Sequence, residues 1–124
     1  MILLRIKGRK TGEPRTTAVN MFERNGVRYV VGTFGETDWV RNLRAAREAI
    51  LIERGRQVPV DAVELPIEDA GPVLHDALEP FLGTRFGSRA LRHYYDVAPG
   101  APLAAYIDEA RRHPIFELRP RRAA

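Results

Sequence analysis

Apolar and polar residues alternate in six short stretches of the chain, as they do in half-buried β-strands. The predicted strands are residues 2–7, 16–23, 28–33, 49–53, 57–64 and 115–118. Asn25-Gly26 separates the second and third stretches, and Arg54-Gly55-Arg56 separates the fourth and fifth, so each pair is expected to form a hairpin. Pro59 indicates a sheet edge or a bulge in the fifth strand.

Apolar residues recur at helical spacing between these strands. Helices are predicted over residues 38–49, with Thr37 as the N-cap, over residues 66–82, and from Pro102 to the residue before Pro114. Gly71-Pro72 interrupts the second helix and would move its start to Asp69 or later. Residues 82–88 are predicted to be a loop, followed by a short segment over 90–95.

Two hairpins and six strands interrupted by helices, without regular strand-helix alternation, favour an α+β fold that is mainly β. The expected architecture is a six-stranded antiparallel barrel with flanking helices, in a single domain over residues 1–124.

Charge and composition narrow the classes of partner. The chain has 20 Lys and Arg residues against 16 Asp and Glu, for a net charge of +4, which favours anionic ligands. It has no cysteine, so neither disulfides nor thiolate metal ligands are available, and a cytoplasmic location is expected. The apolar opening is too short for a signal peptide or a spanning helix, and a strand that begins at Ile2 suggests a trimmed N-terminus.

The loop GRKTGEPRTT, residues 8–17, concentrates cations, hydroxyls and glycines. Arg9, Lys10 and Arg15 supply charge, and the glycines would let backbone N–H groups approach an anion closely. A phosphate site and a solvated basic turn both fit this composition. Walker and G-x-G-x-x-G sequences are absent, so a nucleotide triphosphatase is disfavoured.

Catalytic side chains are scattered. The chain has no Cys nucleophile and no nucleophile elbow, and His75, His93 and His113 lie far apart in the sequence, so no hydrolase or metal site is predicted. The remaining possibility is chemistry carried out by a bound cofactor, such as hydride transfer, in which the protein positions the reactants and supplies the electrostatic environment.

Four segments resemble one known family. LLRIKGRKTGEPRTT resembles a phosphate-binding entry loop, ERNGVRYVVGT a hairpin, TDWVRNLRAA a W-x-x-N-L-(R/K)-A helix and HPIFELRP a closing strand. Together they resemble the deazaflavin-dependent nitroreductase and quinone reductase family of the flavin-binding split β-barrel superfamily. This resemblance implies a split β-barrel that binds 8-hydroxy-5-deazaflavin, coenzyme F-420, whose tail carries phosphate and glutamates.

The resemblance also implies a set of cofactor-binding residues. Arg9, Lys10 and Thr11 would hold the phosphate, and Arg15, Thr16 and Thr17 would line the path from tail to ring. The ring would contact Gly32, Thr33, Phe34, Trp39 and Asn42. A lone Trp39 on an apolar helix face also fits a core anchor. Asn42 on the same face needs a partner, either a ring carbonyl or a neighbouring backbone group.

The chain departs from the family pattern in two places. The loop between Gly32 and Trp39 is shorter, and the usual helix before the first strand is missing. A C-terminal tyrosine lines the substrate pocket in some relatives, and Tyr94, Tyr95 and Tyr106 are candidates, although Tyr106 also fits plain helix core.

The leading hypothesis is therefore an F-420-dependent oxidoreductase that passes hydride to a small acceptor: a quinone, an activated alkene or a nitro compound. A second hypothesis is a split barrel that binds FMN, or that carries a cofactor without turnover. Nucleic-acid binding is a third, but acids are interspersed with the bases and no aromatic base-stacking motif occurs. Oligomeric state, acceptor and peripheral contact with a membrane stay open.

Overall fold

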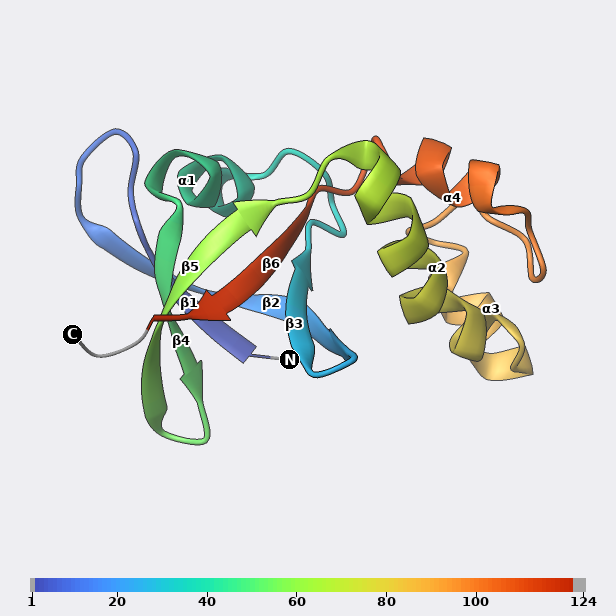
Figure 1. Cartoon of the computed structure of the whole chain (residues 1–124), viewed down its shortest axis with the longest axis horizontal. Helices are drawn as coiled ribbons and strands as arrows, with labels where there is room; N and C mark the ends of the chain where they lie inside the picture. The colour runs from blue at the N-terminus through green and yellow to red at the C-terminus, as the bar shows by residue number, and fades with distance from the viewer. Residues whose placement is uncertain (1, 122–124) are drawn as a thin grey trace.

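The computed structural model describes residues 2–121, which form a closed antiparallel barrel with the strand order β1-β2-β3-β6-β5-β4 (Figure 1). The strands are β1 Ile2–Lys7, β2 Pro14–Arg24, β3 Val27–Val31, β4 Glu48–Glu53, β5 Arg56–Glu64 and β6 Ile115–Pro120. The helices are α1 Asp38–Ala46, α2 Ile67–Leu82, α3 Arg85–Leu91 and α4 Leu103–Ala110. The predicted α+β, mainly β barrel with flanking helices is confirmed.

Both predicted hairpin turns are confirmed. Asn25 and Gly26 have φ of 54° and 78°, and Arg54 and Gly55 have φ of 52° and 76°. Two consecutive residues with positive φ make the two-residue turn whose twist matches that of the flanking strands. These turns set the β2–β3 and β4–β5 registers. The predicted sheet edge at Pro59 is wrong: Pro59 pairs with Ile50 of β4, and on its other side its carbonyl accepts a hydrogen bond from the Arg121 N–H at 3.0 Å.

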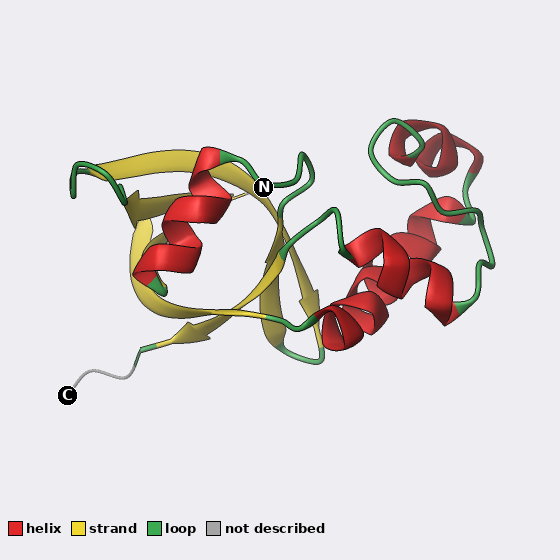
Figure 2. Ribbon diagram, turned by 90° about the horizontal axis from the view of Figure 1, so that it is seen from above, coloured by secondary structure: helices red, strands yellow, loops and turns green. Residues whose placement is uncertain are grey.

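Alternating apolar side chains fill the barrel, and α1 lies across one opening of it (Figure 2). Leu4, Leu51 and Phe116 are buried inside the barrel, and Val40 and Leu43 of α1 are fully buried against them. Helix α1 is shorter than predicted: it ends at Ala46, because Arg47 adopts a left-handed φ of 60° and the chain enters β4 at Glu48.

A second core lies outside the barrel, where α2 and α4 pack together beside β3. Helix α2 runs unbroken through Gly71 and Pro72, so the predicted shift of its start to Asp69 is wrong. The reason for the glycine is close helix contact: a Cβ on Gly71 would lie 2.4 Å from Cγ1 of Ile107 in α4.

The predicted loop over residues 82–88 is also wrong, since α3 occupies most of it. Thr84 is the N-cap, and its side-chain oxygen accepts a hydrogen bond from the Gly87 N–H at 3.0 Å. Figure 1 shows α3 at the end of the helical layer farthest from the barrel.

Candidate cofactor site

The basic loop between β1 and β2 is tighter than predicted, because β2 begins at Pro14 rather than at residue 16. The Gly8 N–H donates to the Glu13 carbonyl at 2.8 Å, and the Gly12 N–H donates to the Gly8 carbonyl at 2.8 Å. These bonds close the loop on itself. Arg15, Thr16 and Thr17 consequently stand on a paired strand rather than on the loop.

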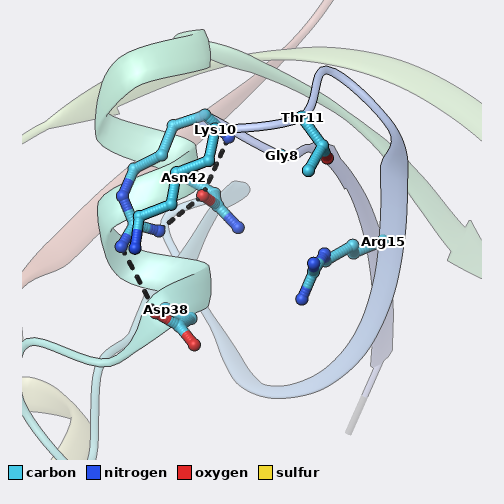
Figure 3. A pocket seen from close by; sticks show the side chains of 7 residues that line it. Gly8, Lys10, Thr11, Arg15, Asp38 and Asn42 are labelled. Carbon is cyan, nitrogen blue, oxygen red and sulfur yellow. Dashed lines mark hydrogen bonds and ion pairs between the residues drawn. The ribbon is translucent and has the colours of Figure 1, made fainter.

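Asn42 of α1 anchors this loop to the barrel. Its Oδ1 accepts hydrogen bonds from the Arg9 backbone N–H at 3.1 Å and from Arg9 Nη1 at 2.7 Å (Figure 3). Arg9 also reaches Asp38 at 3.3 Å. Asn42 is 5% exposed, and the partner it needs is supplied by a backbone group of the loop, one of the two kinds predicted. Asn42 therefore orders the loop directly.

A small hollow of about 120 Å³ lies beside the anchored loop. Its lining residues are Gly8, Arg9, Lys10, Thr11, Arg15, Asp38 and Asn42. Three of these are cations and one is an acid. Among residues 2–121, Lys10 and Arg15 have neither an ion pair nor a side-chain hydrogen bond, so their N–H groups are available to a ligand. This donor set fits a phosphate.

A larger hollow of about 390 Å³ adjoins the first and shares Arg15, Asp38 and Asn42 with it. Its other lining residues are Ile6, Thr16, Thr17, Thr37 and Trp39. The two hollows together form a continuous surface that is cationic at one end and carries hydroxyls and an indole at the other. This arrangement suits a ligand with an anionic tail and an aromatic head.

Thr37 is a lining residue that sequence reasoning missed, because it fitted the role of helix cap. It does occupy the N-cap position of α1, but its side chain makes no capping bond. Within the described part of the chain, Thr37 Oγ1 is the one buried side-chain polar atom without a hydrogen-bond partner. Buried hydroxyls are normally satisfied, so the unpaired oxygen of Thr37 is an exception beside the larger hollow.

Trp39 packs in the core and also faces a hollow. Its ring packs against the barrel core, with its centroid 6.3 Å from that of Phe116, and it also lines the larger hollow. Its contact with a cofactor ring stays a prediction.

Gly32, Thr33 and Phe34 do not join this group. Gly32 is buried, and a Cβ there would lie 3.0 Å from Val40 and 3.2 Å from Pro114. Thr33 and Phe34 line a separate hollow of about 390 Å³, together with Tyr94, Tyr95 and residues near α4. The predicted set is therefore divided between two places on the surface.

A buried network supports the separate hollow. His113 is buried and bonds Thr33 O through Nδ1 at 3.1 Å and Glu109 through Nε2 at 2.7 Å. Burial by itself would raise the pKa of Glu109, but hydrogen bonds from Arg112, His113 and the Asp96 backbone outweigh it and lower that pKa. This network could not be predicted from residue spacing, because it joins segments distant along the chain.

Among residues 2–121, no group of three or more His, Cys, Asp and Glu side chains is arranged to hold a metal ion. None of the helices in that range has the length and apolar character required to span a membrane.

The sequence itself decides the family. The model of the family described as F420H(2)-dependent quinone reductase matches residues 1–79. The chain belongs to this family. The match covers the barrel strands β1 to β5, the basic loop and α1, so it includes both adjoining hollows. The curated proteins contain no significant match.

Solved structures share the fold at low sequence identity. A protein of unknown function from Agrobacterium tumefaciens, Atu2129, has a TM-score of 0.60 and 16% identity over 96% of this chain. The present chain spans only 47% of that protein. An FAD-binding protein from Mesorhizobium loti has a TM-score of 0.55 and 16% identity, covering 98% of this chain and 83% of its own. At such identities the likeness extends to the fold alone.

Proposed function

We propose that the protein is an oxidoreductase that transfers hydride from reduced coenzyme F-420 to a small acceptor such as a quinone, an activated alkene or a nitro compound. Membership of the F420H(2)-dependent quinone reductase family supports the cofactor class. The observation that carries the proposal is the pair of adjoining hollows, cationic at Lys10 and Arg15 and lined by Thr37 and Trp39 farther along.

The residues of the two hollows fit a molecule with a phosphate in its tail. Lys10 and Arg15 would hold the phosphate, with Arg9 and Thr11 beside them. Thr16, Thr17 and Thr37 would hydrogen-bond the linker or the ring edge, and Trp39 would flank the ring. The loop is already ordered by its own backbone hydrogen bonds, so the protein would lose little further freedom on binding the cofactor, which keeps the entropic cost low.

When bound, reduced F-420 supplies the hydride, and the acceptor takes up that hydride together with a proton. The protein contributes by holding donor and acceptor at near-attack distance, which lowers the activation free energy of the reaction by up to about 7–11 kcal/mol in the best cases. No protein nucleophile is required.

Tyr95 would supply the proton if the acceptor occupied the separate hollow that Tyr95 lines. Its Oη lies 3.5 Å from Thr33 Oγ1, and burial raises its pKa, so the phenol stays protonated at neutral pH. Tyr106 instead donates to Glu79 at 2.6 Å inside the helical core, which agrees with the expectation of plain helix core. Solvent is the other proton source.

Turnover tests the proposal. Purified protein is mixed with reduced F-420 and, separately, with a soluble quinone, an enone and a nitroarene, while the oxidised cofactor is followed by absorbance. We expect oxidation at a rate proportional to protein concentration with at least one acceptor. Binding of F-420 without acceleration by any acceptor would support a cofactor carrier instead, and a yellow protein as isolated would favour FMN.

A further inference from the structure

Helix α3 carries an exposed aromatic and cationic face. Phe86 is 88% exposed, and Phe81 at the end of α2 is 59% exposed. Arg85, Phe86 and Arg89 of α3, and His93 just beyond its end, line one open hollow. A phenyl ring this exposed gains nothing from the folded core.

The same segment is cationic throughout. Residues 80–95 contain Arg85, Arg89 and Arg92 and no Asp or Glu. Elsewhere in residues 2–121 eight arginines form ion pairs, for example Arg44 with both Glu36 and Glu64, and six form none. Within residues 2–121, the three arginines of this segment form none. Their charge is therefore available to an anionic partner.

A tight turn joins the end of α2, which carries Phe81, to the start of α3, which carries Phe86. Thr84 Oγ1 donates to the Phe81 carbonyl at 2.8 Å and accepts from the Gly87 N–H at 3.0 Å, which turns the chain tightly from α2 into α3. Figure 1 shows this turn and α3 at the tip of the helical layer, away from the barrel. The tip is free to meet a flat surface.

We propose that this α3 face docks on the surface of an anionic phospholipid membrane. The phenyl rings of Phe81 and Phe86 would enter the interface, and the arginines would lie at the lipid phosphates. Two phenyl rings offer roughly 300–500 Å² of contact, which is below the roughly 800 Å² per partner of a stable protein interface. A bilayer needs no such area, since a few side chains insert into it.

The proposal does not depend on the redox function, because docking involves neither adjoining hollow. It is tested with cofactor-free full-length protein by sedimentation with vesicles of neutral phosphatidylcholine, or of the same lipid with about a third phosphatidylserine. We expect binding to the anionic vesicles only, weakened by added salt.

Two pairs of variants locate the contact. R85Q/R89Q should lower partitioning to anionic vesicles roughly thirtyfold, whereas R54Q/R56Q, which removes the same charge at the β4–β5 turn, should change it less than about twofold. F86S should lower partitioning about tenfold or more, whereas L103S on exposed α4 should not. Circular dichroism checks that each variant is folded.

The proposal is overturned if the wild type does not bind anionic vesicles, if the two double arginine substitutions weaken binding equally, or if F86S binds as well as the wild type. A short RNA added in place of vesicles provides the last comparison. RNA binding that requires Arg85 and Arg89, without vesicle binding, would make the α3 face a nucleic-acid site and would also overturn the proposal.

Discussion

At the scale of single residues, the candidate site contains two kinds of side chain. One kind holds the basic loop in place, and the other is available to bind a ligand. Asn42 is buried and holds the Arg9 backbone N–H and guanidinium, so it orders the basic loop. Lys10 and Arg15 line the same hollow without a protein partner in the described residues. Substituting Asn42 should therefore lower the stability of the fold, whereas substituting Lys10 or Arg15 should lower the affinity for the cofactor.

Replacing Lys10 or Arg15 with alanine should weaken F-420 binding about tenfold to a hundredfold, since each loses a charge-assisted hydrogen bond worth about 1.5–3 kcal/mol. Arg41→Ala is the matched control, because it removes one exposed cation from α1 outside both hollows. Fluorescence titration gives the dissociation constants. Equal affinity for wild type, K10A and R15A would refute the assigned phosphate contacts.

Replacing Asn42 with alanine should lower the free energy of unfolding by about 1–3 kcal/mol, because the Arg9 peptide N–H loses its acceptor near a buried position. Asn20→Ala is the control: Asn20 is exposed and bonds only the Thr33 hydroxyl, so its loss should cost less than about 0.5 kcal/mol. Urea denaturation measures both. An N42A variant as stable as the wild type would contradict the anchoring role.

At the scale of elements, the features that could be predicted from the sequence are those that a few neighbouring residues determine. Asn25-Gly26 and Gly55 specify tight turns by themselves, so the hairpins and their registers followed. Gly71 and Gly87 misled the prediction, because glycine usually indicates the end of a helix. In the structure each glycine instead lies in a helix and allows close packing against a neighbouring turn. The Thr33–His113 contact spans 80 residues, and no spacing rule reveals it.

Gly71→Ala should lower the free energy of unfolding by about 1–3 kcal/mol through overpacking. A Cβ at this position would lie 2.8 Å from the Cα of Ile107, so trimming the Ile107 side chain does not relieve the clash. Gly83→Ala, where the nearest atom would be 3.6 Å away, should be neutral or stabilising by less than about 1 kcal/mol. Thermal or urea unfolding compares the two, and equal stabilities would contradict the packing argument.

At the scale of the whole molecule, Glu109 joins the helical layer to the barrel. Its carboxylate accepts from the Asp96 N–H before α4 and from His113, which in turn bonds the Thr33 carbonyl after β3. Arg112 bonds the same carboxylate. The separate hollow, which Tyr95 lines, therefore lies where the helical layer contacts the barrel.

Glu109→Gln should lower the free energy of unfolding by about 1–3 kcal/mol at neutral pH. The pKa of Glu109 is lowered in the folded state, so its stabilisation is complete above its ordinary value of 4.5 and is lost as the pH falls through the lowered pKa. The difference between wild type and E109Q should therefore shrink in acid. Glu68→Gln, exposed on α2, should cost less than about 1 kcal/mol at any pH. A pH-independent E109Q difference would argue against the ionised carboxylate as its cause.

We propose that the basic loop and the adjoining hollow hold the anionic tail of a redox cofactor. Isothermal titration calorimetry of the wild-type protein with oxidised F-420, and separately with FMN, measures this binding. We expect saturable binding of F-420 at micromolar concentrations, tighter than that of FMN. Absence of binding heat with both ligands across a range of temperatures would contradict the claim.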